Sequence, residues 1–254
     1  RDGLKIREVP DPKIGPDQVL IKISNCGICG SDIFLFKSGG LADGTILGHE
    51  LSGVVEETGA QVQGVALGDR VIARPNGCGE CKFCRAELEN LCTTRRSIGL
   101  GQWPGGFAEY MVADRDMIIP VPEKLSLDQA SMADQLGSAL HGMKMIDFKP
   151  GETALVTGAG PTGLCAVMLL KYYGASKILV SEMLENRSSQ AMHFGADFVA
   201  SPADKSLASS IGEHFGPSGL DCIVECSGNA KATQDVIQCS TIGCRIALVG
   251  MCTQ

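Results

Sequence analysis

Short apolar runs separated by glycine and proline make up most of the first half of the chain. The runs at residues 19–23, 51–56, 69–73 and 107–112 are rich in Val, Ile, Leu and Met, and their length predicts strands. Turns are predicted between them at Gly59, Gly64, Gly68, Pro75, Gly77 and Gly105-Gly106. Many short strands joined by glycine turns predict a compact β-rich or barrel-like unit.

The pattern changes near residue 134, where longer apolar segments begin to alternate between strand and helix character. Helices are predicted at 130–143, 164–173 and 185–194. Ser126 and Asp128 lie near the start of the first, and Gly195 ends the third. Strands are predicted at 153–158, 177–181, 198–199, 220–225 and 245–250. This alternation predicts a parallel sheet and an α/β fold class, with domains at 1–135 and 136–254.

Composition and charge narrow the class of protein. The 254 residues are 44% hydrophobic and 20% charged, which is ordinary for a globular chain. The net charge of −7 gives no basic field, so we expect no nucleic-acid partner. No apolar run approaches the ~20 residues that span a membrane, and the N-terminus does not resemble a signal peptide. Twelve cysteines, several in apolar runs, favour a reducing compartment, hence the cytoplasm.

Four of the cysteines crowd into one short lobe at about 77–93. They are Cys78, Cys81, Cys84 and Cys92, with the spacing C-x2-C-x2-C-x7-C. Four thiolates this close can enclose one tetrahedral zinc ion, and a shell without an open position predicts a structural role. An iron–sulfur cluster is the main alternative, but the bacterial ferredoxin motif has three residues before its last cysteine and a proline after it. Disulfides fit poorly with a reducing compartment.

A second cluster of candidate ligands lies at 26–50. Cys29, His49 and Glu50 offer a thiolate, an imidazole and a carboxylate, the ligand types of a catalytic zinc with an open position. Ser31 follows the thiol closely, so its hydroxyl could lie beside a bound substrate. Asp32 could accept a hydrogen bond from the far nitrogen of a ligating imidazole.

The segment 158–163 predicts a dinucleotide site. Its residues are Gly158, Ala159, Gly160, Pro161, Thr162 and Gly163. This G-x-G-x-x-G motif follows a predicted strand and opens a helix, and an acid, Glu182, ends the next strand 24 positions later. The helix N-terminus would face the phosphates. Glu182 favours NAD over NADP, because a carboxylate accepts from ribose hydroxyls and repels a 2′-phosphate. Arg187 leaves NADP open, since an arginine can accommodate that phosphate.

Together these motifs resemble one family, the zinc-containing medium-chain alcohol dehydrogenases, and within it the polyol, threonine and butanediol dehydrogenase branch. The segments Cys29-Gly-Ser31-Asp32 and Gly48-His49-Glu50, the four-cysteine lobe, the glycine motif and Glu182 stand in the family's order, and the resemblance covers essentially the whole chain. It implies a GroES-like catalytic domain joined to a Rossmann domain, with the active site in the cleft between them.

The resemblance also implies roles for individual residues. Cys29 and His49 match catalytic zinc ligands, Glu50 a carboxylate at or near the metal, and Asp134 the position of a further ligand. Ser31 matches the hydroxyl that hydrogen-bonds the substrate oxygen. Ser138 matches a residue beside the nicotinamide, and Gly250 is expected at the cofactor too.

Two positions qualify this picture. Many family members carry a histidine three residues after the Ser31 position as the outer end of a proton relay, whereas this chain has Phe34, so the proton must leave by another route. Trp103 falls where relatives line the substrate pocket, but packing in the core or a loop is an equal alternative.

The implied activity is hydride transfer between a small secondary alcohol, diol or polyol and NAD, giving a ketone or aldehyde, with one catalytic and one structural zinc ion. Alternatives are a dehydrogenase of primary alcohols or formaldehyde, and a zinc-free quinone reductase-like or non-enzymatic relative. A homodimer or homotetramer is expected for the full-length protein. The resemblance further implies a sixth Rossmann strand and a C-terminal return to the catalytic domain, so we expect this sequence to be a fragment.

Overall fold

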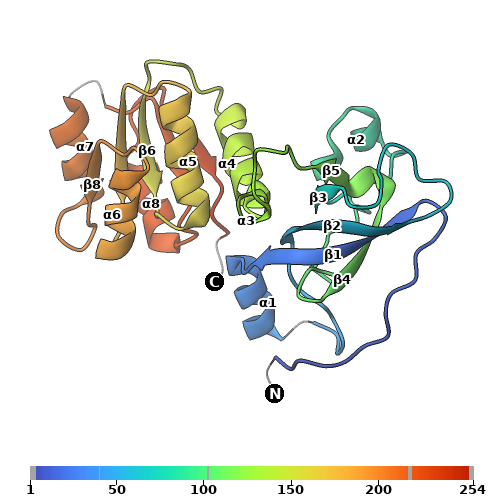
Figure 1. Ribbon diagram of the computed structural model, residues 1–254. Helices are drawn as coiled ribbons and strands as arrows, with labels where there is room; N and C mark the ends of the chain where they lie inside the picture. Colours follow the sequence, from blue (N-terminus) through green and yellow to red (C-terminus); the bar gives the residue numbers. More distant parts are fainter. Residues whose placement is uncertain (1–3, 40, 102, 217–218, 252–254) are drawn as a thin grey trace. The chain divides into compact units, whose positions relative to one another are not determined.

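The computed structural model describes residues 4–39, 41–101, 103–216 and 219–251. By the clustering of its contacts the chain divides into two compact units, Arg1–Asp134 and Gln135–Gln254. Each unit is built around its own sheet and its own core (Figure 1). The predicted α/β fold class, a β-rich unit followed by a parallel-sheet unit, is confirmed.

The first unit contains a curled antiparallel sheet with the order β4-β1-β2-β3-β5. Its strands are β1 (Gln18–Gly27), β2 (Glu50–Thr58), β3 (Arg70–Ala73), β4 (Tyr110–Asp114) and β5 (Ile118–Pro120). Alternate residues of β1, such as Val19 and Ile21, are fully buried, as expected for a strand with one face on a core. The sequence pattern had not predicted β5, a three-residue edge strand.

The pairing of β1 with β2 carries two register shifts, between Leu20 and Ile21 and between Ile23 and Asn25. Beyond the second shift the ladder continues to its last pair, Gly27 opposite Glu50. A β-bulge of this kind bends the strand and re-aims the side chains that follow it. The end of β1 therefore lies beside the start of β2.

The helical segments of the first unit are short. They are α1 (Gly30–Ser38), α2 (Lys82–Arg85), α3 (Leu127–Ala130) and the 3₁₀ turns Glu89–Leu91 and Arg115–Met117, while α4 (Ala133–Met145) runs into the second unit. The single helix expected at 130–143 is interrupted at 131–132. Ser126 caps α3 through a capping box with Gln129, and the Ser131 hydroxyl donates to the Asp128 carbonyl, which competes with continued helix.

The second unit contains a parallel sheet with the order β10-β9-β6-β7-β8, the arrangement of the first five strands of a dinucleotide-binding fold. Its strands are β6 (Thr153–Thr157), β7 (Lys177–Ser181), β8 (Phe198–Ala200), β9 (Cys222–Glu225) and β10 (Arg245–Leu248). Its other helices are α5 (Pro161–Tyr172), α6 (Glu185–His193), α7 (Leu207–Phe215) and α8 (Ala230–Cys239), of which α7 and α8 were not predicted.

Two apolar clusters cover the two faces of this sheet. Val156 and Val180 belong to one cluster with residues of α4, α5 and α6, whereas Leu155 and Leu179 belong to another with α7 and α8 (Figure 1). Neighbouring residues in each strand thus point to opposite faces, both buried, which explains the continuous apolar runs in the sequence.

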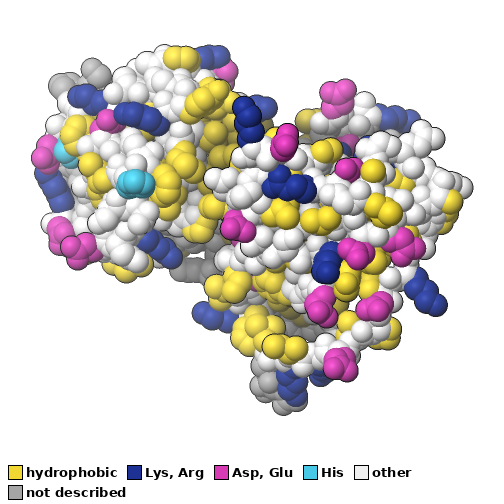
Figure 2. Space-filling model, viewed as in Figure 1, with side chains coloured by type: hydrophobic (Ala, Val, Ile, Leu, Met, Phe, Trp, Pro, Cys, Tyr) yellow, Lys and Arg dark blue, Asp and Glu magenta, His cyan; other side chains and the backbone are white. Residues whose placement is uncertain are grey.

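In the described part of the chain, no helix has both the length and the apolar character needed to cross a membrane. Lysine and arginine side chains are interspersed with aspartate and glutamate on the face shown in Figure 2. This face therefore presents no field of a single sign.

Candidate functional site

The ends of β1 and β2 bring the first ligand cluster together. Cys29 lies two residues beyond the end of β1 and immediately before α1, and His49 immediately precedes β2, which begins at Glu50. Since Gly27 stands opposite Glu50, the thiol, the imidazole and the carboxylate converge although about twenty positions separate them in the sequence. Their candidate ligand atoms all lie within 4.8 Å of one another.

This donor set fits a zinc ion. Sulfur, nitrogen and carboxylate oxygen are its usual protein ligands, and three of them leave a fourth position for a substrate or water. Cys29 and His49 are half-buried and Glu50 is only 4% exposed, so the protein shields the cluster without closing it. Asp134 is not part of this group of three.

Asp32 holds two of the three candidate ligands in place. Its Oδ2 accepts a 2.8 Å hydrogen bond from the backbone N–H of Cys29, and its Oδ1 lies 3.5 Å from His49 Nδ1. Neither Asp32 Oδ1 nor His49 Nδ1 has a full hydrogen-bond partner among the described residues. The Asp32 carboxylate, helped by Cys29, nevertheless raises the pKa of His49 to about 10. With Nδ1 facing this carboxylate, Nε2 is the nitrogen available to a metal.

Ser31 lies on the metal side of His49, as the sequence predicts for a substrate-contacting hydroxyl. Its Oγ is 3.4 Å from His49 Nε2, the nitrogen that would ligate the ion. A proton on Ser31 Oγ would therefore lie next to the position that a bound oxygen would occupy. Phe34, one turn further along α1, is exposed and offers no proton-accepting atom at the position where a relay histidine was missing.

The two other acids near the site are both held toward their neutral forms. Burial raises the pKa of Glu50, although Cys29 and His49 oppose it, and the negative charges of Asp134 and Asp32 add to it. Desolvation likewise raises the pKa of Asp134, with His49 opposing and Asp32 adding to the rise. Asp134 lies in the first turn of α4. A cation placed among these acids would be favoured by all of them.

The four cysteines of the lobe at 77–93 also converge. The Sγ atoms of Cys78, Cys81, Cys84 and Cys92 lie within 4.8 Å of one another. Cys81 Sγ is 3.5 Å and Cys78 Sγ is 3.9 Å from Cys84 Sγ. A zinc–sulfur bond of about 2.3 Å in a tetrahedron implies sulfur–sulfur distances of about 3.8 Å, so the cluster matches a four-thiolate zinc site.

The backbone of the lobe points its N–H groups at the sulfurs. The N–H groups of Cys78, Cys81 and Cys84 donate to the sulfurs of Cys92, Cys78 and Cys81 respectively, each at 3.4 Å. The Thr94 hydroxyl and the Cys78 N–H lower the pKa of Cys92 to about 6, whereas desolvation raises that of Cys84 to about 12. Such donors stabilise thiolates, which is the form that binds metal.

The predicted dinucleotide motif has the expected local structure in the second unit. Gly158 follows β6 with φ of 82°, Gly160 is the N-cap of α5, and Pro161 and Thr162 form its first turn. A Cβ on Gly163 would lie 1.9 Å from the Gly158 carbonyl oxygen, so only glycine allows α5 to pack this closely against the turn after β6. A Cβ on Gly160 would meet no described atom within 4 Å, which leaves space where a pyrophosphate would approach.

Glu182 is anchored more firmly than the sequence indicated. Its Oε2 accepts from the Ala159 N–H at 2.8 Å, and its Oε1 accepts from the N–H groups of Met183 and Leu184. Burial would raise the pKa of Glu182, but these hydrogen bonds and the nearby Arg187 outweigh it and lower the pKa. The carboxylate therefore stays ionised at the end of β7 and ties it to the glycine turn.

The remaining predicted cofactor residues lie in three separate places of the second unit. Arg187 is exposed in α6, and Ser138 is exposed in α4. Gly250 follows β10 and donates its N–H to the Glu225 carbonyl, and a Cβ there would come 2.3 Å from the Gly228 nitrogen. Gly250 thus lies at the carboxyl ends of the strands, the edge at which dinucleotides bind in this class of sheet.

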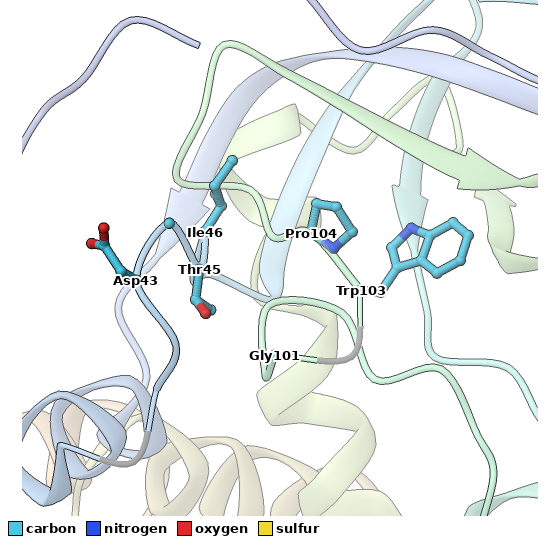
Figure 3. A pocket seen from close by; sticks show the side chains of 7 residues that line it. Asp43, Thr45, Ile46, Gly101, Trp103 and Pro104 are labelled. Carbon is cyan, nitrogen blue, oxygen red and sulfur yellow. The ribbon is translucent and has the colours of Figure 1, made fainter. Parts of the chain in front are cut away.

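Trp103 packs into the β-rich core. Its Nε1 donates to the Val112 carbonyl at 2.8 Å, and the Arg96 guanidinium lies 5.1 Å from the ring. Part of Trp103 also lines a hollow of about 270 Å³ with Asp43, Gly44, Thr45, Ile46, Gly101 and Pro104. Figure 3 shows the indole ring directed away from Asp43 and Thr45. The packing interpretation thus holds for the ring.

Sequence reasoning missed two features that orient the site. The helix α1 was not predicted, because it carries no apolar stripe. Among its residues, all of which the structure describes, only Asp32 is buried. The spacing Cys29-x-x-Asp32, which places an acid at the third helical position, was the available signal. The three amides that bind Glu182 had no signal in the sequence pattern.

Comparison with known proteins agrees with these two units. The family model of the alcohol dehydrogenase GroES-like domain matches residues 15–123, and that of the zinc-binding dehydrogenases matches residues 161–254. The chain is 38% identical to the (R,R)-butanediol dehydrogenase of Saccharomyces cerevisiae over 87% of the chain and 66% of that protein. It is 34% identical to the L-threonine 3-dehydrogenase of a Marinomonas species, over 98% of the chain and 74% of that protein.

Solved structures give the same picture. A zinc-binding dehydrogenase from Sinorhizobium meliloti bound to NADP superposes with a TM-score of 0.91 at 31% identity, over 98% of this chain and 73% of that one. The 2R,3R-butanediol dehydrogenase of Bacillus subtilis superposes with a TM-score of 0.83 at 30% identity, over 95% and 72%. The chain spans about two thirds to three quarters of the length of these relatives.

Proposed function

Because the chain belongs to the zinc-binding alcohol dehydrogenase family, we propose that it is an oxidoreductase that transfers a hydride between a secondary alcohol or vicinal diol and NAD. The observation that carries this proposal is the cluster of Cys29, His49 and Glu50 within 4.8 Å, with the Ser31 hydroxyl beside it. Butanediol and threonine dehydrogenases among the relatives support a secondary hydroxyl with a polar neighbour as the substrate class.

Zinc in this site would supply a Lewis acid that makes the substrate hydroxyl acidic near neutral pH, and the nicotinamide would accept the hydride. The residues of the chain supply position and proton transfer. Cys29, His49 and Glu50 would hold the ion, and Asp32 would fix the His49 ring so that Nε2 faces the substrate. Ser31 Oγ would accept the substrate proton and pass it outward.

We further propose one zinc ion in this site and one in the four-cysteine lobe, and NAD as the cofactor. The ionised Glu182 supports NAD, because a second negative group next to it would be repelled. In the Glu182→Ala variant the ratio of kcat/KM with NAD to that with NADP should fall by about tenfold or more. An unchanged ratio would count against Glu182 as the cofactor-selecting residue.

A panel of substrates tests the reaction itself. The protein is offered 2,3-butanediol stereoisomers, L-threonine, sorbitol, ethanol and the formaldehyde–glutathione adduct, with NAD or NADP, and reduced nicotinamide is followed by absorbance. Secondary alcohols should give kcat/KM at least about tenfold above ethanol. Turnover confined to ethanol or to the formaldehyde adduct would favour the primary-alcohol alternative, and turnover that survives removal of zinc would exclude the proposed mechanism.

We also propose a cytoplasmic enzyme that assembles as a homodimer or homotetramer. No disulfide links the cysteines of the described residues, which suits a reducing compartment. Light scattering on the purified protein measures the mass of the assembly, and a monomer at all concentrations would contradict this part of the proposal.

A further inference from the structure

Gly27 and Glu50 face each other across the last pair of the β1–β2 ladder. In an antiparallel pair, residues directly opposite each other project their side chains to the same face, with their Cβ atoms about 5 Å apart. A side chain at position 27 would therefore share its space with Glu50. Glycine leaves that space to the Glu50 carboxylate.

The distances show how completely Glu50 uses this space. A Cβ built on Gly27 would lie 2.2 Å from Glu50 Oε2, 3.3 Å from Glu50 Cδ and 3.2 Å from Glu50 Cβ. All three of the nearest atoms thus belong to the same side chain. The first distance is far inside van der Waals contact, so the carboxylate and a methyl group at position 27 cannot occupy their places together.

The backbone does not explain the glycine. Gly27 lies within strand β1 and is not among the glycines with positive φ, so its conformation is open to any residue. The group that an alanine would strike is the far end of a flexible side chain rather than backbone. An alanine should therefore be accommodated mainly by movement of the carboxylate, together with a shift of a few tenths of an ångström at Glu50 Cβ, which lies 3.2 Å away.

Movement of the carboxylate has a chemical consequence, because Glu50 is part of the ligand cluster. It is 4% exposed and its oxygen lies within 4.8 Å of the candidate ligand atoms of Cys29 and His49. In this place Cys29 and His49 favour its ionised form, whereas the charges of Asp134 and Asp32 oppose it. Displacement of the carboxylate moves its oxygen away from the ligand atoms of Cys29 and His49, and the cluster loses that donor.

We propose that Gly27 is a positioning residue of the metal centre, which keeps the Glu50 carboxylate at the ion by having no side chain. This inference rests on the proposed function, in that it assumes a metal ion at Cys29, His49 and Glu50. It adds a residue that binds neither metal nor substrate and acts on the site only through Glu50.

Metal affinity tests the proposal without reference to turnover. The protein is stripped of metal at this site and titrated with Co2+ against a competing chelator, and the visible absorption of thiolate-bound cobalt reports occupancy and geometry. The Gly27→Ala and Glu50→Ala variants should each bind Co2+ about tenfold more weakly than wild type, with similarly altered spectra. In the double variant Gly27→Ala/Glu50→Ala the affinity should equal that of Glu50→Ala alone, because the two changes remove one interaction.

Gly30→Ala is the matched control. Gly30 lies in the same segment, at the start of α1, and a Cβ there would meet no described atom within 4 Å. Its Co2+ affinity should stay within about twofold of wild type. Thermal unfolding of each variant checks that the fold is retained.

Three results would overturn the inference. One is a Co2+ affinity of Gly27→Ala within about twofold of wild type. Another is that Gly27→Ala weakens Co2+ binding as much in the Glu50→Ala background as it does in wild type. The third applies if the Gly27→Ala variant fails to fold. Removal of the Glu50 side chain should then restore folding, because the clash is with that side chain. A Gly27→Ala/Glu50→Ala double variant that also fails to fold would show that Gly27 serves another purpose. A wild-type chain that takes up Co2+ only in the four-cysteine lobe would instead reject the proposed function, and this inference with it.

Discussion

The two candidate metal sites of this chain differ in how the fold builds them. The four-cysteine lobe draws its ligands from one segment, in which neighbouring cysteines and their own backbone N–H groups surround the sulfurs. The mixed site draws Cys29 from the end of β1 and His49 and Glu50 from the start of β2, and it depends on Asp32 and Gly27 for its geometry. A closed shell of identical ligands suits a structural ion, whereas an incomplete and supported shell suits chemistry.

The largest effect is expected from removing a ligand of the mixed site. Cys29→Ser and His49→Ala should each lower kcat by about a thousandfold or more, since the Lewis acid is lost. Titration with reduced cofactor should give an unchanged dissociation constant, because the dinucleotide motif lies in the other unit. Cys26→Ala is the control, since Cys26 lies close by in sequence but outside the ligand cluster. Normal turnover in either ligand variant would break the distinction between the sites.

Removing a ligand of the lobe should instead cost stability. In Cys81→Ala the unfolding temperature should fall by on the order of 10 °C, because metal binding in a closed thiolate site contributes directly to folding. The molecules that stay folded should keep most of their activity. Cys244→Ala, a half-buried cysteine of the parallel-sheet unit, is the control and should shift the midpoint much less. A Cys81→Ala protein that is fully stable yet inactive would reverse the roles of the two sites.

The carboxylates around the mixed site should differ in importance. Glu50→Gln should weaken metal binding about tenfold, because the Glu50 oxygen belongs to the ligand cluster. Asp134→Asn should weaken it by less than about threefold, since Asp134 lies outside the ligand cluster and interacts with His49 through its charge. Competition with a chelator gives both affinities. An Asp134→Asn variant affected more strongly than Glu50→Gln would make Asp134 the third ligand.

The smallest effect is expected at Glu182. It lies outside both metal sites, so its variant gives a baseline for comparison with variants of those sites. Its pKa is lowered in the folded state, so its stabilising contribution is full above the unfolded value of about 4.5 and is lost as the pH falls through the lower folded value. Glu182→Gln should be less stable than wild type at pH 7 by about 1 kcal/mol, and the difference should shrink below pH 4.5. Denaturant unfolding at several pH values measures it, and a difference that grows on acidification would contradict the assigned direction.

Local patterns were readable from the sequence, and contacts between distant segments were not. The spacing of Cys78, Cys81, Cys84 and Cys92 is nearly sufficient to define their lobe, because all of its ligands come from one turn-rich segment. The glycine motif and the apolar strands of the parallel sheet were equally local. The pairing of Gly27 with Glu50 follows two register shifts between β1 and β2, which leave no mark in the hydrophobic pattern.

The register of β1 also limits how this protein can change in length over generations. One residue inserted between the second shift and Gly27 would slide the segment leading to Cys29 by about 3.3 Å and turn its side chains to the other face. A residue inserted between Cys84 and Cys92 only lengthens a connection that bends back on itself. Related sequences should therefore tolerate insertions and deletions in the four-cysteine lobe but not at the end of β1. A glycine inserted after Asn25 should abolish metal uptake at Cys29, whereas one inserted after Ala86 should leave both ions bound.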